Sequence, residues 1–502
     1  MRKAGYFIGH NAERPVRLKV FFLNIPYHER YTRESRSPGV APSGTLYYPI
    51  YLSLAAGLVR SRGYEINFLD APAAGYDLVQ TEERVLKFKP DLIVATTVTA
   101  SVTHDVEVMH HLAQKSQAMT MLVGTHPTAR PLETLKMSST LDFVTVGEYD
   151  FTVLEVVEHF ANGKKREELS GVKGLAYRLG DQFFLNERRP WHENLDEIPW
   201  ASLIYRDFLK IEDYSYGAQL HPEVTIVSGR GCPYQCTFCV FPQTITGQRY
   251  RPRSVGDVVN EMEFIHRTWP QNKEIMFEDD TLTVDKERMR QLSEEILRRG
   301  LKVTWSGNAR ADFDDVDLLK LMKKAGCRLF CVGFESADQG ILDEMRKGGS
   351  TVKMRERFVK VCHEAGIMIH GCFLFGGAHE TRETMRKTLN LAKRMKVDTA
   401  QFFPIMVYPG TRAYEEAKAQ GELDSENYDQ WLRQNGYYAS QVHRGELTGE
   451  EISQFTDRAY REFYLRPSFV LSKAWQFLFY PEERSRIFFG FKFFIKKLFA
   501  KG

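Results

Sequence analysis

The first part of the chain alternates short apolar runs with helical patterns. Buried parallel strands form continuous apolar runs, and strands that alternate with helices build a doubly wound sheet. The pattern therefore predicts an α/β domain over residues 15–150, with ligands bound beyond the carboxyl ends of its strands. The five expected strands lie at residues 17–23, 64–71, 91–97, 119–124 and 142–147.

A second alternating series follows a linker over 151–220, which contains a small hairpin at 171–186. Six strand–helix repeats predict a partial (β/α)6 TIM barrel over 221–410, with functional groups at the strand carboxyl ends. Its expected strands lie at 224–228, 274–279, 302–307, 328–335, 367–376 and 399–407, and its expected helices include 255–268, 286–299, 317–324 and 382–396.

The C-terminal region is expected to be helical over 411–466 and to end in an aromatic, basic tail over 467–502. An amphipathic helix of this kind is typical of a segment lying in a membrane interface. A tail docked on the protein itself, or forming a dimer contact, is the alternative. The apolar stripe consists of Ile487, Phe488, Phe491, Phe494, Ile495 and Leu498, and Lys492, Lys496 and Lys497 lie off it.

Composition narrows the choice of protein class. The 502 residues are 43% hydrophobic and 26% charged, as in a globular protein, and the net charge of +3 does not favour nucleic-acid binding. The sequence contains no recognisable signal peptide and no apolar window long enough to span a membrane. It therefore predicts a cytoplasmic protein, with the tail as a contact to the inner face of the membrane.

Three of the seven cysteines form the strongest chemical signal. Cys232, Cys236 and Cys239 follow the first expected strand of the second series with the spacing C-x3-C-x2-C. Thiolates are soft ligands for zinc or iron–sulfur clusters. Each could bind one iron of a [4Fe–4S] cube and leave the fourth iron open. Zinc would need a further ligand, and the nearest imidazole, His221, precedes the strand; three unligated thiols are the remaining alternative.

The other four cysteines allow two interpretations. Cys327 and Cys331 are four residues apart on an expected strand, so they should share one face. They are candidates for a second cluster, although free cysteine is often a small buried apolar residue. Cys362 and Cys372 are expected to be core thiols for the same reason.

The cysteine motif, with the aromatic Phe238 before its last cysteine, resembles the radical S-adenosylmethionine (radical SAM) superfamily. The resemblance implies that the three cysteines are catalytic and metal-binding. The open iron would bind the amino and carboxylate groups of SAM, and reductive cleavage would give a 5′-deoxyadenosyl radical.

Polar residues at the ends of the following strands resemble the SAM contacts of that family. The alternative for each residue is a strand-end carboxylate in an ion pair or a glycine of the core. The resemblance implies SAM contacts at Glu278, Asp279, Asp280, Asn308, Arg310, Glu335 and Ser336, and along the segment 371–377 that contains Gly376.

The first domain resembles the Rossmann- or flavodoxin-like cobalamin-binding domain of one radical SAM branch. That branch includes the anaerobic Mg-protoporphyrin monomethyl ester cyclase, hopanoid-modifying enzymes and carbon methyltransferases. The resemblance rests on Tyr48-Pro49, Gly63 and the segments 124–127 and 146–148. It implies cobalamin contacts at Thr97, Ser101, Gly124, Thr125, His126, Gly147 and Glu148.

One departure concerns the cobalt. No Asp-x-His-x-x-Gly loop is present, so the face of cobalt turned away from the barrel would be water-bound, vacant or covered by an aromatic or apolar residue. His126 is alternatively a loop histidine with its hydrogen bonds satisfied, and Thr97 and Ser101 are alternatively helix caps. The domain is alternatively a lid that has lost its cofactor.

The combination predicts a cobalamin-dependent radical SAM enzyme that methylates an unactivated carbon of a lipid, isoprenoid or other secondary metabolite. Oxidative cyclisation, rearrangement or carbon–carbon bond formation without methyl transfer is the alternative, and a non-catalytic iron–sulfur sensor or binding protein is an alternative of another class. The expected partners are a small-molecule or lipid substrate and an electron donor such as flavodoxin or ferredoxin. The loop at 408–411 is expected near the substrate, or is a tight turn.

Overall fold

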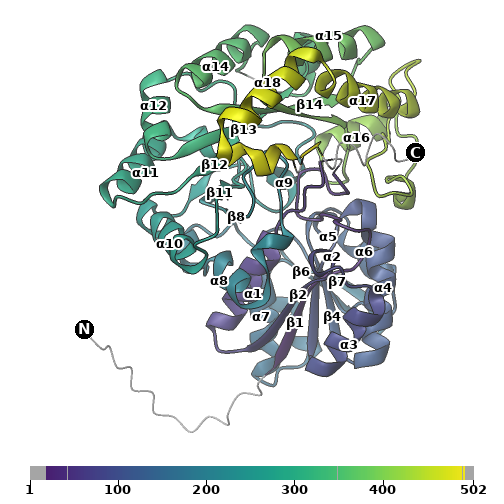
Figure 1. The fold of residues 1–502 in the computed structure, drawn as a ribbon. Coiled ribbons are helices and arrows are strands. Elements are labelled where there is room, and N and C mark those ends of the chain that lie inside the picture. Colours follow the sequence, from purple (N-terminus) through teal and green to yellow (C-terminus); the bar gives the residue numbers. More distant parts are fainter. Residues whose placement is uncertain (1–17, 42, 348, 489, 492–502) are drawn as a thin grey trace.

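The computed structural model describes residues 18–491 except 42, 348 and 489. Figure 1 shows two α/β units, the first in purple and blue and the second in teal and green, with the last helices in yellow across the second.

The first unit is a seven-stranded sheet in the order β2-β1-β3-β4-β5-β6-β7. Its first five strands are parallel, which confirms the doubly wound prediction, and their order is that of flavodoxin-like folds. The predicted hairpin adds two antiparallel strands to this sheet, which the sequence did not indicate. The strands are β1 (Lys19–Asn24), β2 (Glu65–Asp70), β3 (Leu92–Thr96), β4 (Met119–Val123), β5 (Phe143–Thr145), β6 (Leu175–Leu179) and β7 (Gln182–Leu185).

Helices cover both faces of this sheet because alternate residues of its strands are apolar on both sides. Val20 and Phe22 pack in the core that contains α1 (Ile50–Ser61) and α7 (Asp150–Ala161). Phe21 and Leu23 pack in the opposite core. The helices of that face are α3 (Leu78–Phe88) and α4 (Val102–Ser116), and α5 (Thr125–Ala129) and α6 (Pro131–Lys136) follow β4.

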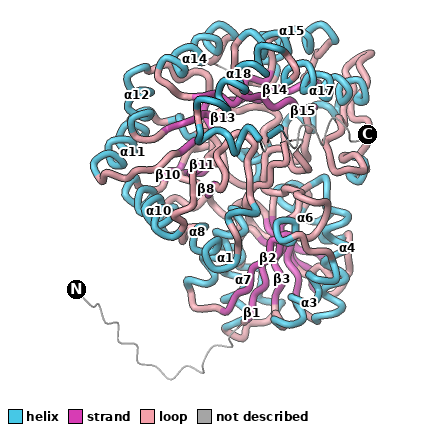
Figure 2. Tube along the Cα trace, viewed as in Figure 1, coloured by secondary structure: helices cyan, strands magenta, loops and turns pink. Residues whose placement is uncertain are grey.

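The second unit is a six-stranded parallel sheet in the order β15-β14-β13-β12-β11-β8, as predicted for a partial barrel. Figure 2 shows its helices outside the curved sheet. The strands are β8 (Glu223–Ile226), β11 (Glu274–Phe277), β12 (Trp305–Ala309), β13 (Cys327–Glu335), β14 (Met368–Phe375) and β15 (Thr399–Pro404). The helices are α10 (Val255–Thr268), α11 (Lys286–Arg298), α12 (Val316–Lys324), α13 (Gln339–Glu344), α14 (Val352–Glu364) and α15 (Arg382–Arg394). Helix α8 (Ala201–Phe208) precedes the barrel and packs mainly against α1.

The prediction that Cys327 and Cys331 share a face is wrong. Cys327 pairs with Trp305, but the next residue of β12 pairs with Leu329, so β13 carries an extra residue between the two cysteines. A bulge of this kind changes the face to which the following side chains point. Cys327 packs in the outer core with Cys362, whereas Cys331 packs inside the barrel with Leu329.

The C-terminal region is less helical than predicted. Helices α16 (Arg412–Ala419), α17 (Gly449–Tyr464) and α18 (Pro467–Phe479) are present, but residues 420–448 form loops with short β-bridges. Contacts with the first unit hold these loops in place. Tyr438 donates a hydrogen bond of 2.7 Å to the Ser37 carbonyl, and the Val40 amide donates one of 2.9 Å to Gly436.

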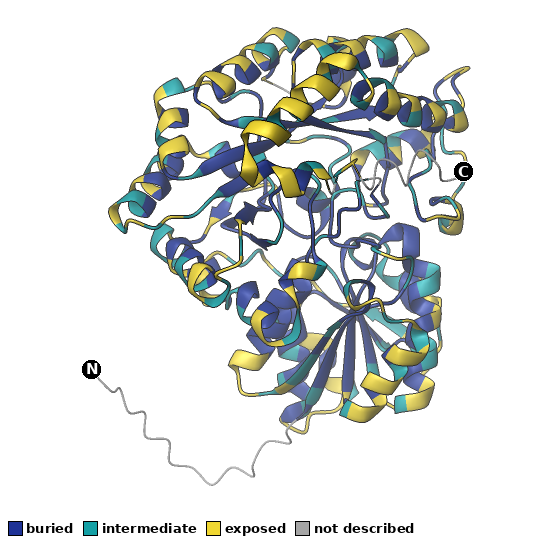
Figure 3. Ribbon diagram, viewed as in Figure 1, coloured by how far each residue is buried: buried dark blue, intermediate teal, exposed yellow. Residues whose placement is uncertain are grey.

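Helix α18 has no buried residue, and Figure 3 shows it largely exposed. Leu471, Trp475, Leu478 and Phe479 are its most exposed large apolar residues. Among the described residues, no helix combines the length and apolarity needed to cross a bilayer. The predicted stripe is described only as far as residue 491, so Phe494, Ile495 and Leu498 lie outside the described residues.

Candidate active site

A short antiparallel ladder closes the base of the cysteine loop. It joins β9 (Gly229–Arg230) to β10 (Arg251–Pro252). Gly231 follows β9 with φ at +87°, and a Cβ there would lie 2.2 Å from the Arg249 carbonyl oxygen, so only glycine fits. At the other end, Gln243 of α9 (Val240–Thr244) donates its side-chain amide to three carbonyls of the loop. No sequence pattern indicated this role for Gln243.

The three motif thiols line one cavity of about 210 Å³ at the carboxyl ends of the barrel strands. Cys232 Sγ lies 3.3 Å from Thr281 Oγ1. Burial raises the pKa of the Cys232 and Cys239 thiols. In the part of the chain that the structure describes, no three Cys, His, Asp or Glu side chains gather as ligands for a single ion. The motif supplies three thiols, whereas a structural zinc site takes four protein ligands, so the donor set suits an iron–sulfur cluster better than zinc.

The three carboxylates after β11 divide between the two sides of the chain. Glu278 and Asp280 line the cavity. Asp279 points away from it and accepts hydrogen bonds from the Ser228 amide at 2.6 Å and the Ser228 hydroxyl at 2.7 Å. Burial raises the pKa of Asp279 to about 6. The expectation that Asp279 faces a ligand is therefore wrong, because successive side chains of an extended segment alternate.

Arg36 joins the first unit to this cavity. It lies in the loop between β1 and α1, and its guanidinium contacts the Glu278 carboxylate and lies 3.4 Å from Asp280 Oδ1. It also donates a 3.0 Å hydrogen bond to the Asp279 carbonyl. A cation from the first unit thus offsets the negative charge at the end of β11.

Asn308 and Arg310, at the end of β12, both line the cavity. Asn308 donates a 3.0 Å hydrogen bond to the Asp279 carbonyl. Arg310 pairs with Asp312 at 2.9 Å, and its Cζ lies 3.5 Å from the centre of the Tyr234 ring in the cysteine loop. These contacts orient the Arg310 guanidinium beside the cysteine motif.

At the ends of β13 and β14, as at the end of β11, some of the predicted residues line the cavity and others lie behind it. Glu335 lines the cavity with a left-handed φ of +60° and accepts a 2.6 Å hydrogen bond from Lys347. Ser336 lies behind it, fully buried, and contacts Thr388 of α15. Gly376 is held by Glu380 and by Arg444 and is not among the residues that line the cavity. Ser336 and Gly376 therefore support the site from outside it.

Phe238 of the cysteine motif lines the cavity, and its ring centre lies 6.0 Å from Lys347 Nζ. Cys372 also lines it and is half-buried, so the expectation of a core thiol is wrong for this residue. Other lining residues come from distant parts of the chain and were not predicted. They are Arg36, Tyr47, Tyr216, Lys347, Gln401, Phe403 and Tyr438.

At the carboxyl edge of the first sheet, Thr97 and Ser101 both donate hydrogen bonds to Asp105, at 2.7 and 2.6 Å. Asp105 also forms a fully buried ion pair with Arg33. This network connects the end of β3 with the start of α4 and with the loop after β1. Both hydroxyls are thus used within the protein, and Ser101 bonds a carboxylate instead of capping α4 with its side chain.

His126, after β4, is almost fully buried beside this network. Its Nδ1 lies 3.1 Å from Thr99 Oγ1, and its ring meets the Tyr428 ring edge-on. Its Nε2 has no hydrogen-bond partner among the described residues, so the expectation of a satisfied histidine is wrong. Burial lowers the pKa of His126 to about 3, which keeps the imidazole neutral.

Gly124 precedes His126 with φ at +122°, and a Cβ there would lie 2.5 Å from the Thr97 carbonyl oxygen. Thr125 is buried at the start of α5. This close approach of two strand-end loops requires glycine at position 124. Gly147, with φ at +87°, lies against Arg188.

Glu148 belongs to a buried ion-pair network between the two units. Its carboxylate accepts from Arg230 at 2.7 Å and from Arg251 at 2.9 Å, and the His192 amide adds a bond of 3.0 Å. Arg230 also pairs with Asp150. Both oxygens of Glu148 are therefore committed to protein contacts, and the predicted cobalamin contact is not what this structure shows.

Two family models match the chain. The radical SAM superfamily model matches residues 226–392, and the B12-binding domain model matches residues 36–157. An uncharacterized methyltransferase of Pyrococcus horikoshii is 31% identical over 435 residues, which are 86% of this chain and 91% of that protein. The anaerobic magnesium-protoporphyrin IX monomethyl ester cyclase of Rubrivivax gelatinosus is 26% identical over 96% of this chain and 83% of that protein.

Among solved structures, the fold is similar to the radical SAM methyltransferase TsrM of Kitasatospora setae with cobalamin and a [4Fe–4S] cluster bound. The TM-score is 0.68 at 17% identity, and the match covers 90% of this chain and 89% of that one. At this identity the likeness concerns the fold. With the two family models and the Pyrococcus relative, it leaves one conclusion: this chain belongs to the radical SAM enzymes that carry a B12-binding domain, and its cofactors are a [4Fe–4S] cluster, SAM and cobalamin.

Proposed function

We propose that this enzyme transfers a methyl group to an unactivated carbon of a small molecule. The observation that carries the proposal is that Arg36 and Tyr47, from the B12-binding unit, line the same cavity as the three motif thiols. A cofactor held by the B12-binding unit and a cofactor held by the barrel would therefore face the same cavity. Oxidative cyclisation is the second candidate, because the cyclase relative matches 96% of the chain.

Cys232, Cys236 and Cys239 would hold the cluster. Their fit rests on the donor set, since three thiols line one cavity and the motif includes no fourth protein ligand. Gln243, by fixing three loop carbonyls, would hold the thiols in place when the cluster binds.

SAM would bind over the carboxylates and cations of the same cavity. It carries a cationic sulfonium, an ammonium and a carboxylate, so it needs both signs of charge at its site. Glu278, Asp280 and Glu335 supply negative charge, and Arg310 and Lys347 supply positive charge. Phe238 and Asn308 complete the wall, whereas Asp279, Ser336 and Gly376 would act as supports.

Cobalamin would be held at the carboxyl edge of the first sheet by Gly124, Thr125, His126 and Gly147. The fit rests on Nε2 of the neutral His126, a buried polar atom without a hydrogen-bond partner among the described residues. Thr97 and Ser101 would shape this edge through Asp105, and Glu148 would join it to the barrel.

When bound, these groups supply reductive cleavage of SAM to a 5′-deoxyadenosyl radical and a methyl group carried on cobalt. The chain itself orients the reactants and excludes water. Tyr47 and Tyr216, whose ring centres are 5.1 Å apart, and Phe403 and Tyr438, 5.4 Å apart, form aromatic parts of the cavity wall. These rings keep solvent from the carbon to be modified.

The enzyme also needs a one-electron donor, and we propose flavodoxin or ferredoxin.

We propose further that α18 rests on the inner face of the membrane, where its exposed side chains would enter the lipid interface. Leu471 is 69% exposed, Trp475 59% and Leu478 64%, and a soluble chain rarely exposes such a contiguous set. A lipid or isoprenoid substrate would be reached from this position.

The proposed reaction is tested with anaerobically reconstituted enzyme, SAM, dithionite and hydroxocobalamin. Methyl transfer predicts S-adenosylhomocysteine beside 5′-deoxyadenosine, because one SAM would donate the methyl group and another would be cleaved to the radical. The matched control replaces all three motif cysteines with alanine. Formation of 5′-deoxyadenosine alone, with cobalamin bound, would contradict methyl transfer and favour the cyclase type of reaction.

A further inference from the structure

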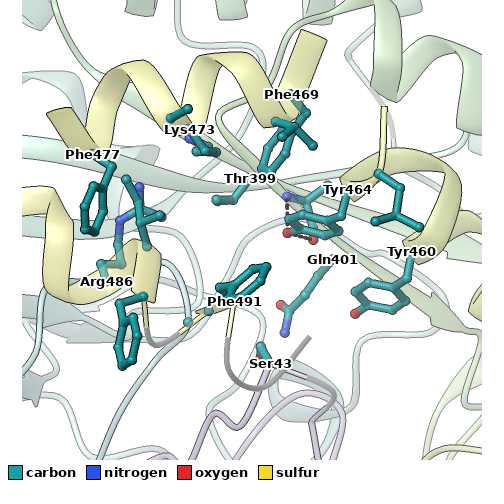
Figure 4. A pocket seen from close by; sticks show the side chains of 18 of the residues that line it. Ser43, Thr399, Gln401, Tyr460, Tyr464, Phe469, Lys473, Phe477, Arg486 and Phe491 are labelled. Atoms are coloured by element: carbon teal, nitrogen blue, oxygen red, sulfur yellow. Dashed lines mark hydrogen bonds between the residues drawn. The ribbon is translucent and has the colours of Figure 1, made fainter. Parts of the chain in front are cut away.

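A second and larger cavity lies between the open edge of the barrel and the C-terminal helices. Its volume is about 570 Å³, which is within the range of small-molecule sites. In Figure 4, Phe469, Lys473 and Phe477 of α18 lie on one side and Ser43 and Phe491 on the other. We call it the tail chamber; its apolar wall is formed by Ala400, Leu465, Phe469, Val470, Ala474, Phe477, Leu478, Ile487, Phe488 and Phe491.

The tail chamber adjoins the cavity of the cysteine motif. Gln401 of β15 lines both cavities. Among the described residues β15 is the edge strand of the partial barrel, and its side chains border the space under α18. Gln401 is therefore a wall that the tail chamber and the barrel interior share.

A buried cation with one unused hydrogen-bond donor lies in the wall of this apolar space. Arg486 is 5% exposed; its Nε donates to Glu483, but one of its Nη atoms, Nη2, has no partner among the described residues. Lys473 also lines the chamber, and its Nζ bonds the uncharged Gln476 side chain. A buried guanidinium nitrogen without an acceptor costs free energy. An anionic oxygen that accepts its hydrogen bond would remove this cost and bind favourably here.

The neighbouring carboxylates already have partners. Glu483 is shared between Arg486 and Arg328, Arg328 is also paired with Glu274 at 2.9 Å, and Asp398 bonds His363. Burial and the charge of Arg486 lower the pKa of Lys473 to about 7, while Asp398 and Glu483 oppose the shift and Arg328 adds to it. An anion in the chamber would thus satisfy Arg486 and favour the protonated form of Lys473.

We infer that the tail chamber binds an apolar molecule with an anionic end group, a carboxylate or a phosphate, whose charged end meets Arg486 and Lys473 and whose hydrocarbon extends past Gln401 toward the motif cavity. This inference names the substrate class and rests on the proposed function. A neutral hydrocarbon would leave Nη2 of Arg486 without an acceptor, and a compact polar anion would leave the apolar wall uncovered.

The test measures binding to the cluster-containing enzyme by displacement of the fluorescent fatty acid cis-parinaric acid. Dodecanoate and dodecyl phosphate carry the two candidate end groups, and dodecanol carries none. At least one anion should bind about tenfold more tightly than dodecanol, which is the effect of one hydrogen bond to a charged group. The better anion identifies the end group.

Two substitutions locate the binding site. Arg486→Gln should weaken anion binding about tenfold and leave dodecanol binding unchanged, which also shows that the chamber is still formed. Ala474→Trp, which fills the chamber, should weaken both classes of ligand. Arg458→Gln removes an exposed arginine of α17 and is the matched control, with no effect on either.

The inference is overturned if dodecanol binds as tightly as both anions, or if Arg486→Gln changes neither. Cleavage of SAM by the same preparation is measured in parallel. Persistent cleavage without any displacement refutes the tail chamber alone, whereas specific anion binding without cleavage refutes the proposed reaction and leaves the ligand site standing.

Discussion

Replacing Glu148 by glutamine separates a structural role of this residue from a role in binding cobalamin. Glu148 is 6% exposed and accepts from Arg230, Arg251 and the His192 amide. Glutamine keeps the shape and one acceptor but removes the charge. Arg230 keeps Asp150, whereas Arg251 is left with carbonyl partners alone.

The expected cost lies at the lower end of the range for breaking a buried ion pair, about 3 kcal/mol. With a urea dependence of about 3 kcal/mol per molar, the unfolding midpoint falls by about 1 M. The effect should depend on pH. Burial opposes ionisation of Glu148, but Arg230 and Arg251 outweigh it and hold the pKa of the carboxyl below its usual value. Its contribution is therefore complete above the unfolded pKa, near 4.5, and is lost as pH falls through the lower folded pKa.

The assay is urea unfolding of the wild type and Glu148→Gln at pH 7 and at about pH 4, followed by tryptophan fluorescence, with corrinoid content of the folded protein measured separately. We expect the midpoints to differ at pH 7 and the difference to be smaller at about pH 4, which lies below the unfolded pKa, with equal corrinoid content at both. Equal midpoints at pH 7 together with loss of corrinoid would refute the structural role.

Three further predictions follow from the site. Asp280→Asn should weaken SAM binding about tenfold, whereas Asp279→Asn, which points away from the cavity, should change it less than about twofold; equal effects in equilibrium binding would contradict the assignment. Gly124→Ala should lower stability by about 1–3 kcal/mol and reduce corrinoid content, because its Cβ meets the Thr97 carbonyl oxygen; a urea midpoint at the wild-type value refutes this. Dodecanoate should bind less tightly as pH rises through about 7, where Lys473 loses its proton, and Lys473→Met should remove this dependence; a flat profile in the wild type counts against it.

The elements that could be predicted are those whose formation depends on residues close together in the chain. The apolar runs became β8 and β11–β15, and α10 begins and ends where its periodicity does, because apolar pattern and capping act within one element. The loops at 420–448 escaped prediction because contacts with residues near Ser37 and Val40 hold them.

The site, like the fold, was predictable where it depends on contiguous residues and unpredictable where it depends on contacts between distant ones. The cysteine motif is contiguous, so its spacing alone indicated the chemistry. Arg36 meets Glu278 across 242 residues of sequence, and nothing in either segment indicates the pairing. The bulge that separates the faces of Cys327 and Cys331 arises from pairing between β12 and β13, which neither strand shows by itself. Likewise, which of Asp279 and Asp280 faces the cavity depends on the register at which the chain leaves β11, and the sequence of this segment does not show that register.

The most direct test of this account is electron paramagnetic resonance of the anaerobically reconstituted and reduced protein, with and without SAM. The account predicts about four irons per chain, a cluster signal that changes on addition of SAM because the fourth iron is open to it, and neither iron nor signal when Cys232, Cys236 and Cys239 are all alanine. A signal indifferent to SAM, or the same iron content in the alanine variant, would contradict it.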